Sequence, residues 1–132
     1  PTLYKLYERC QNEQCKVLYI HGKGISHPDS EPVKAWVQYL SYFNIEKYKD
    51  CIRILDFADI CGTEWLGNHY RGNFWWANSN YIASLPPVID SSYTGPESWI
   101  ASNPTHNVFN FHLTYQYPYV DIIKENTYRP LT

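Results

Sequence analysis

The chain has 132 residues, of which 44% are hydrophobic and 18% are charged, and its formal net charge is −2. This composition is typical of one globular domain and excludes an intrinsically disordered chain. Lys and Arg do not cluster in the sequence, so the basic stripe that meets a nucleic-acid backbone is missing and we expect no nucleic-acid partner.

The apolar runs and the cysteines bear on where the protein works. No apolar run approaches the roughly 20 residues of a membrane span, and no signal-peptide pattern is present. Cys10, Cys15, Cys51 and Cys61 include no C-x-x-C pair, which argues against a structural zinc site. We predict free thiols in a reducing, cytoplasmic compartment, with a Cys10–Cys15 disulfide as the alternative.

The first half of the chain predicts a helix, a strand and a long helix. Residues 2–12 have helical apolar spacing, and residues 16–22 form an apolar run that ends at glycine, as a buried strand does. After a loop, apolar residues recur at steps of three and four over residues 31–57, which predicts one long helix. The chain has no Met and opens directly in a helix, so we expect a domain truncated at its amino end.

The second half predicts shorter elements. Residues 58–65 and 73–78 are typical of buried strands, and residues 79–86 of a short helix that ends at consecutive prolines. Residues 95–102 predict one or two helical turns, and residues 106–115 alternate like a strand before an irregular tail. Because strands alternate with helices, we predict an α/β domain with a mainly parallel sheet.

In open α/β sheets, ligands bind beyond the carboxyl ends of the strands. Several residues here end a predicted strand, follow one or lie in the last one: His21, Lys23, Gly24, Glu64, Glu97 and His112. We hypothesise that they converge on one pocket.

Aromatic residues are unusually frequent, with 13 Tyr, 5 Trp and 5 Phe. In the run "GNFWWA", a strand would place Phe74 and Trp76 on one side and Asn73 and Trp75 on the other. One set would pack against the long helix, and the other would form a sugar-stacking wall with Asn73 bonding hydroxyls. The alternative is that both tryptophans lie in the core.

A resemblance to a known family rests on motifs in a fixed order. The segments "LYIHGKGISHP", "EKYKDCIRILDFADICGTEW", "HYRGNFWWANSNYIASLP", "ESWI" and "NFHLTYQYP" resemble a glycosyltransferase-like family of large DNA viruses, microbes and some eukaryotes. Its members carry H-T-K-G, H-x-x-G-N-F-W-W-A and an acidic residue before W-I. The family is similar to rhamnan-synthesis glycosyltransferases and, more remotely, to the GT-A fold of nucleotide-sugar enzymes.

The resemblance implies a fold and a function. It implies a GT-A-like, three-layer α/β fold, with residues 1–132 as a single domain or its carboxyl-side portion. The implied activity moves a sugar from a nucleotide-sugar donor to the hydroxyl of a saccharide or protein acceptor. A non-catalytic saccharide- or protein-binding module on the same scaffold is the alternative.

The resemblance also assigns residues to the donor. His21, Lys23 and Gly24 would contact the donor diphosphate, because a lysine ammonium neutralises phosphate directly and glycine lets the backbone approach. GT-A enzymes commonly hold Mn²⁺ or Mg²⁺ there with Asp-x-Asp. His21 and Lys23 replace those carboxylates, so dependence on Mn²⁺ or Mg²⁺ stays open. The alternative is a surface turn.

The remaining assignments concern the acceptor side. The resemblance makes Glu97 the catalytic base and His112 a metal ligand, and His69 and Arg71 could meet a phosphate or the acceptor. The alternatives are a carboxylate that favours the helix dipole at Glu97, solvated loop residues at 69 and 71, and an ordinary strand histidine at 112.

Overall fold

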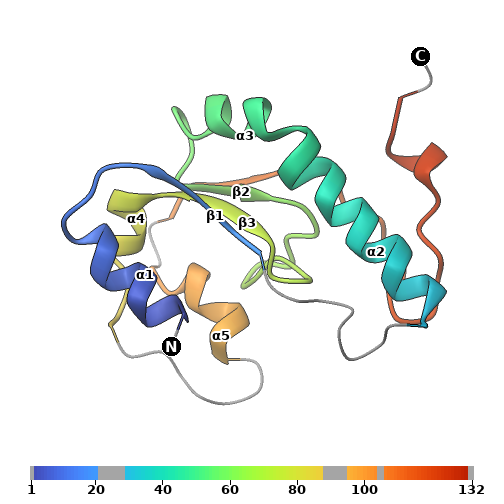
Figure 1. The fold of residues 1–132 in the computed structure, drawn as a ribbon, viewed down its shortest axis with the longest axis horizontal. Coiled ribbons are helices and arrows are strands. Elements are labelled where there is room, and N and C mark those ends of the chain that lie inside the picture. The colour runs from blue at the N-terminus through green and yellow to red at the C-terminus, as the bar shows by residue number, and fades with distance from the viewer. Residues whose placement is uncertain (1, 21–28, 88–94, 104–105, 131–132) are drawn as a thin grey trace.

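A four-stranded sheet lies between two groups of helices in the computed structural model, which describes residues 2–20, 29–87, 95–103 and 106–130. The strands occur in the order β1-β3-β2-β4 and comprise Lys16–Tyr19, Trp75–Asn78, Ile60–Gly62 and Val108–Asn110. One face packs against α1 (Thr2–Cys10), α4 (Ser79–Ala83) and the helical turns Gly95–Ser98 (α5) and Trp99–Ala101. The other packs against α2 (Glu31–Ser41) and α3 (Tyr48–Ile54) (Figure 1). The predicted α/β class is confirmed.

The prediction of a mainly parallel sheet is wrong. Strand β3 runs antiparallel to both β1 and β2, whereas β2 and β4 are parallel. The reason is the connection between β2 and β3. Parallel neighbours need a crossover, usually a helix, but residues 63–74 form a helix-free loop that sends the chain straight back.

The predicted helix over residues 31–57 is interrupted. Ser30 caps α2 by accepting a hydrogen bond from the N–H of Val33 (3.3 Å), and a π-helical turn over Tyr42–Glu46 separates α2 from α3. Within this turn the carbonyl of Asn44 accepts a hydrogen bond from Trp76 Nε1 (2.8 Å), while its side-chain amide donates to Leu40 O. The π-helical turn therefore ties the layer of α2 and α3 to β3 through the hydrogen bond from Trp76.

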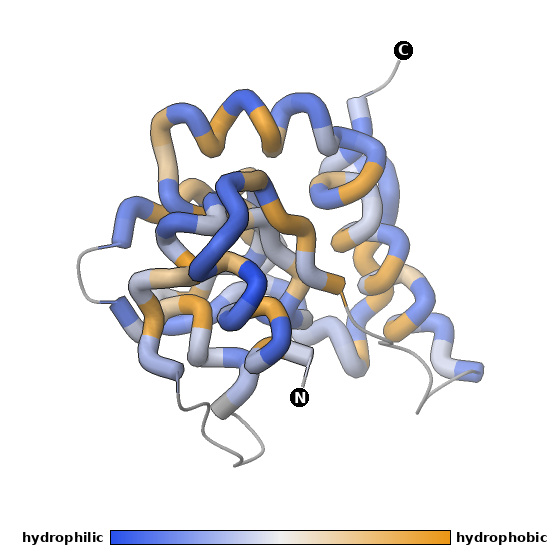
Figure 2. Tube along the Cα trace, turned by 60° about the vertical axis from the view of Figure 1, so that its left-hand side comes forward, coloured by the Kyte–Doolittle hydropathy of each residue, from blue (hydrophilic) through white to orange (hydrophobic). Residues whose placement is uncertain are grey.

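The aromatic run in β3 faces both layers, as the strand period predicts. Trp75 is buried in the cluster with α1 and α4, and Trp76 is buried against Cys51 and Leu55 of α3 and the loop after it. Phe74 packs in a third cluster with residues of α2. Figure 2 shows the hydrophobic segments gathered between the layers. The core is thus aromatic on both sides of the sheet.

The carboxyl-terminal segment lies alongside α2 (Figure 1). Residues 111–130 contain a single short 3₁₀ turn (Glu125–Thr127), so the chain beyond Pro118 is irregular as predicted, whereas the strand predicted over residues 106–115 is limited to Val108–Asn110. Ile123 and Tyr128 pack with α2 and the π-helical turn, and Arg129 forms two hydrogen bonds to the Glu46 carboxylate (3.0 and 2.8 Å). These contacts hold the tail in place.

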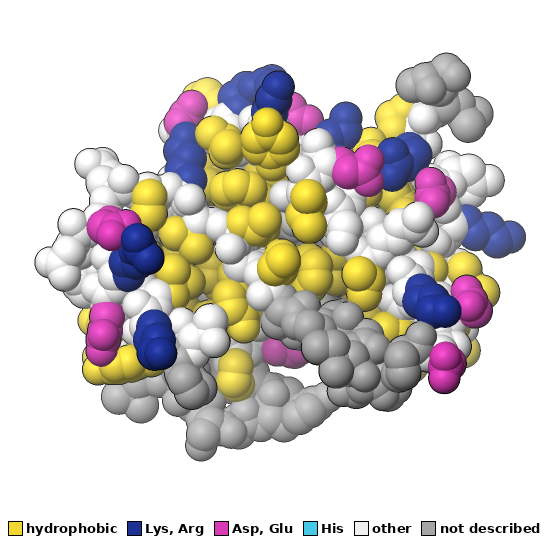
Figure 3. Space-filling model, viewed as in Figure 1, with side chains coloured by type: hydrophobic (Ala, Val, Ile, Leu, Met, Phe, Trp, Pro, Cys, Tyr) yellow, Lys and Arg dark blue, Asp and Glu magenta, His cyan; other side chains and the backbone are white. Residues whose placement is uncertain are grey.

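The surface carries apolar side chains on one face, and none of the cysteines is bridged. Figure 3 shows apolar side chains in the middle of the face where Figure 1 places β1, an edge strand, and α3. All four cysteines are free, so the structure has no Cys10–Cys15 bridge. Among the residues that the structure describes, no helix is long and apolar enough to cross a membrane.

Buried tyrosines predict instability at alkaline pH. Burial raises the pKa of the Tyr70 phenol well above its ordinary value, and burial followed by the charge of Asp59 raises the pKa of Tyr81. The folded chain keeps these protons, whereas unfolded tyrosines lose theirs above about pH 10. We therefore expect the free energy of unfolding to fall above that pH, by up to about 1.4 kcal/mol per pH unit for each such tyrosine.

Urea unfolding between about pH 8 and about pH 11, followed in parallel by tyrosinate absorbance, measures this effect. The expected result is that part of the absorbance change coincides with unfolding. Ionisation of every tyrosine near about pH 10 without loss of stability would contradict it.

Candidate functional site

One edge of the sheet collects the carboxyl ends of three strands and the amino end of the fourth. In the cross-strand register, Tyr19 lies opposite Trp75, Trp75 opposite Gly62, and Gly62 opposite Asn110. The carboxyl ends of β1, β2 and β4 therefore meet the amino end of β3 at this edge, which we call the rim. Such an edge is where open α/β sheets bind ligands. Glu64 and His112, which follow β2 and β4, lie side by side at this edge, whereas the single pocket expected for all six residues stays a prediction.

Glu64, two residues beyond β2, has a buried carboxylate in a strained backbone position. Its side chain is 2% exposed and its φ is 59°, in the left-handed region that L-residues other than Asn and Asp rarely occupy. Its N–H donates to His112 O and its carbonyl accepts from the N–H of Arg71, both at 2.9 Å. Carboxylate Oε1 accepts from the N–H of Thr114 (2.9 Å).

The second carboxylate oxygen of Glu64 is the unusual feature. Oε2 is buried and has no partner with full hydrogen-bond geometry among the residues that the structure describes, although the Tyr39 hydroxyl lies close enough for an interaction with this carboxylate to raise the pKa of Tyr39. Buried carboxylate oxygens nearly always have partners, because an unpaired one loses its hydration without compensation. Strained backbone and unpaired buried polar atoms concentrate at functional sites. Glu64 therefore combines two independent signs of a site.

Glu64 lines a cavity of about 350 Å³, which we call the Glu64 pocket. The lining residues are Glu64, Leu66, Arg71, Leu113, Tyr115, Gln116 and Tyr117. The guanidinium of Arg71 donates through Nη1 to Gln116 O (2.8 Å), which joins the two chain segments that form the walls. The pocket is lined by an acidic residue, an arginine and two tyrosines, a combination of residue types that suits a polyhydroxylated ligand.

A second polar contact lies behind Glu64. Tyr39, which is fully buried, makes a 2.9 Å hydrogen bond between its hydroxyl and His112 Nδ1, and the ring of Phe43 stacks on the imidazole. Burial, followed by the negative charge of Glu64, strongly raises the pKa of Tyr39. Tyr39 therefore stays a neutral phenol that fixes the orientation of His112.

The predicted metal role of His112 stays a prediction. Its Nδ1 is occupied by Tyr39, which leaves Nε2 as the nitrogen that could bind an ion. Within the described ranges, no group of three or more His, Cys, Asp or Glu side chains could hold a metal. Mn²⁺ and Mg²⁺ take about six ligands and prefer oxygen, so these residues alone do not fit such an ion.

The "GNFWWA" motif builds the turn that leads into β3. Gly72 and Asn73 both have positive φ values, 95° and 57°. Asn73 Oδ1 accepts from the indole Nε1 of Trp75 (2.9 Å), so this side chain holds the core rather than a ligand. Trp75 and Trp76 are only 1% and 9% exposed. The core interpretation therefore describes both indoles, and neither presents an open face for stacking.

The other predicted residues are dispersed or undescribed. Arg71 lies in the Glu64 pocket, whereas His69, half-buried in the preceding turn, bonds Asn68 Oδ1 through Nδ1 (2.7 Å). Glu97 lies half-buried in the first turn of α5, in the layer of α1 and α4 (Figure 1). His21, Lys23 and Gly24 lie outside the described residues, so their donor role stays a prediction.

Sequence reasoning gave Glu64 a place at the rim but no role, and it missed the wall formed by residues 113–117. A local signal for that wall exists in "TYQYPY", where tyrosines occupy alternate positions of a non-helical segment. Outside a β-strand, alternation shows neither that the rings share one side nor that they meet Glu64.

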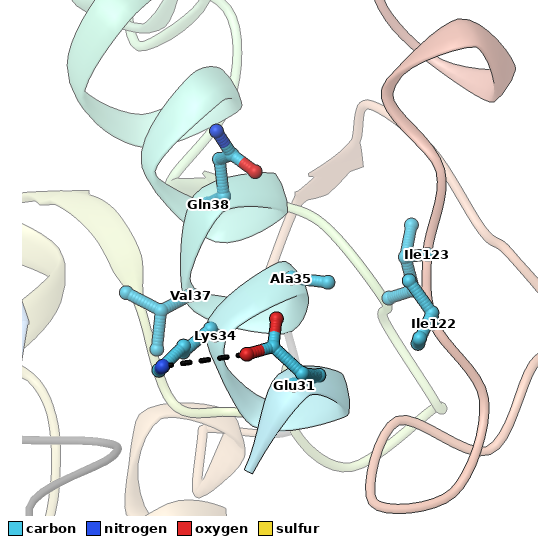
Figure 4. A pocket seen from close by; sticks show the side chains of 7 residues that line it. All are labelled: Glu31, Lys34, Ala35, Val37, Gln38, Ile122 and Ile123. Atoms are coloured by element: carbon cyan, nitrogen blue, oxygen red, sulfur yellow. Dashed lines mark hydrogen bonds and ion pairs between the residues drawn. The ribbon is translucent and has the colours of Figure 1, made fainter. Parts of the chain in front are cut away.

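A larger groove lies between α2 and the carboxyl-terminal segment (Figure 4). It measures about 510 Å³ and is lined by Glu31, Lys34, Ala35, Val37, Gln38, Ile122 and Ile123. Its charged residues, Glu31 and Lys34, are exposed and pair with each other at 3.4 Å. We therefore assign the site to the smaller Glu64 pocket, which holds a buried and unpaired carboxylate oxygen.

Comparisons with known proteins give one match. A family model for a domain of unknown function, DUF8361, matches residues 1–92, more than half of the chain. No match was found among curated proteins or among solved structures.

Proposed function

The chain belongs to this domain family of unknown function, DUF8361, and we propose that it transfers a sugar from a nucleotide-sugar donor to a hydroxyl of an acceptor in the Glu64 pocket. The observation that carries the proposal is Oε2 of Glu64, a buried oxygen without a full hydrogen-bond partner among the described residues, beside a cavity at the carboxyl ends of strands. The ordered glycosyltransferase-like motifs of the sequence also support it.

In this reaction Glu64 is the general base. Oε2 is shielded from solvent in this structure, so the transfer requires the pocket wall to shift when the acceptor binds. Oε2 then accepts the proton of the acceptor hydroxyl while that oxygen attacks the anomeric carbon of the donor. A new carbon–oxygen bond forms, the bond from the anomeric carbon to the diphosphate breaks, and the nucleoside diphosphate leaves with the electron pair. Thr114 keeps the carboxylate aligned through Oε1, which leaves Oε2 for the acceptor.

The remaining groups bind and orient the substrates. The Arg71 guanidinium and the Gln116 side chain line the pocket and can bond acceptor hydroxyls. Lys23 would neutralise the diphosphate, with His21 and Gly24 beside it, as the motif resemblance implies. The assignment of the base to Glu64 departs from the motif-based expectation for Glu97, and a direct comparison tests it.

A non-catalytic saccharide-binding module is the second candidate. Among the described residues that line the pocket, Glu64 is the single acidic residue, and this observation favours the binding module. Binding without transfer would need no base, and the buried carboxylate would then accept hydrogen bonds from sugar hydroxyls.

Release of nucleoside diphosphate distinguishes the candidates. The intact chain is incubated with UDP-, GDP- and TDP-sugars, with and without mono- and disaccharides, in the presence and absence of Mn²⁺. We expect at least one nucleotide-sugar donor to release its nucleoside diphosphate, and we expect this release to require added acceptor. Saccharide binding in ligand-observed NMR without release from any donor would refute transfer and support the binding module.

A further inference from the structure

Three tyrosines of the segment that borders the Glu64 pocket have exposed side chains, although Tyr119 also packs edge-on against Trp36 with ring centroids 5.1 Å apart. Tyr115 is 89% exposed, Tyr117 is 61% exposed and Tyr119 is 45% exposed, and together they form what we call the tyrosine strip. Tyr115 and Tyr117 also line the Glu64 pocket, so the strip begins at its mouth. We propose that the tyrosine strip is an acceptor subsite that binds a saccharide chain extending out of the pocket, an inference that rests on the proposed function.

The backbone under the strip is held in place by polar contacts. The N–H of Thr114 donates to Glu64 Oε1, and Arg71 Nη1 donates to Gln116 O. The N–H of Gln116 donates to Thr114 Oγ1 (3.1 Å), and the N–H of Tyr117 donates to Asp121 Oδ2 (2.9 Å). A loop fastened in this way presents its rings in a fixed arrangement, which lowers the entropic cost of binding.

The conformation of Tyr115 gives the fold no evident benefit. Its φ is 60°, a left-handed conformation that costs an L-residue roughly 1–2 kcal/mol and that Gly or Asn would adopt more easily. Its ring gains little from burial, because it is almost fully exposed. A strained position that displays a large aromatic ring next to a pocket is explained by a ligand that covers the ring.

The residues of the tyrosine strip suit a saccharide ligand better than an added β-strand or an aliphatic protein surface. Pro118 lies between two of the tyrosines and lacks the N–H that pairing with another strand would use. Tyrosine offers a flat apolar face for the C–H side of a sugar ring and a hydroxyl for its edge. The rings of Tyr117 and Tyr119 are 6.3 Å apart between centroids and tilted by 58°, so they offer two separate surfaces to successive units.

Chain-length dependence of saccharide affinity tests the proposal. The intact chain is titrated with glucose, galactose and mannose, and with linear oligosaccharides of each, by calorimetry or ligand-observed NMR. We expect at least one oligosaccharide to bind roughly fivefold to tenfold more tightly than its monosaccharide. Tyr115→Ala should remove this gain, and Tyr115→Phe, which keeps the ring, should retain most of it.

The matched control is Tyr4→Ala, which removes a tyrosine on α1 that is 48% exposed and should leave the gain unchanged. Equal affinity of monosaccharides and oligosaccharides for the wild-type chain would overturn the proposal, as would a gain that survives Tyr115→Ala. A different experimental result would refute the proposed function alone. A gain that depends on Tyr115, without release of nucleoside diphosphate from any donor, would refute transfer but leave the tyrosine strip as a saccharide site.

Discussion

Glu64→Gln is expected to lower the rate of sugar transfer by about 10²–10⁴-fold while the fold and acceptor binding persist. Glutamine has the shape of glutamate, and its amide oxygen can still accept the hydrogen bond from the N–H of Thr114. The amide cannot take the proton of the attacking hydroxyl, so only the chemical step loses its base. Acceptor-dependent release of nucleoside diphosphate measures the rate.

Glu97→Gln is the matched comparison, because Glu97 is the base that the family resemblance assigns. We expect this variant to keep most of the activity. The opposite result, in which Glu97→Gln is inactive and Glu64→Gln turns over normally, would return the role of base to α5 and make Glu64 a structural residue. Thermal unfolding of both variants, with an unchanged melting temperature, shows that lost activity does not reflect lost structure.

Gly72→Ala is expected to destabilise the fold by about 2–4 kcal/mol. A Cβ at this position would lie 2.7 Å from Leu40 Cδ1 and 3.2 Å from Trp36 Cζ2, and the φ of 95° is strained for alanine. Leu40 is fully buried, so it has little room to retreat. The backbone accounts for roughly 1–2 kcal/mol of the cost and the overpacking for the rest.

Gly67→Ala separates the two causes. Gly67 has nearly the same φ, 94°, but no atom lies within 4 Å of its added Cβ. Urea unfolding of both variants should therefore show a smaller loss for Gly67→Ala, close to the backbone cost alone. Equal losses would mean that the turn into β3 tolerates the methyl group, and that Gly72 serves the backbone conformation only.

The sequence predicts the elements of this fold better than their directions. Hydrophobic periodicity located β1, β3 and the helices, because it reports which side of an element is buried. It did not reveal that the loop over residues 63–74 returns the chain antiparallel, since that depends on the absence of a crossover helix. The π-helical turn was also hidden, because its apolar spacing departs little from that of an α-helix.

The position of the candidate site at the end of β2 could be predicted from the sequence, but the residues that line it could not. The end of β2 placed Glu64 at the rim, and the structure shows it there beside the carbonyl of His112. Periodicity assigned Trp75 and Trp76 to opposite faces correctly, yet it could not tell an open face from one that a helix covers. The contact between Glu64 and Thr114 joins residues 50 apart, and no local pattern encodes such a pairing.

The Glu64 pocket is assembled from two stretches of chain, and this division has a consequence for how the family could diversify. Glu64 and Arg71 belong to the stretch that the DUF8361 model matches, whereas Thr114 and the exposed tyrosines lie past its last matched position, residue 92. In the proposed reaction, the base therefore lies within the matched stretch and the exposed tyrosines of the acceptor side lie outside it. A relative that keeps the first stretch and replaces the second should retain the same carboxylate while accepting a differently shaped partner.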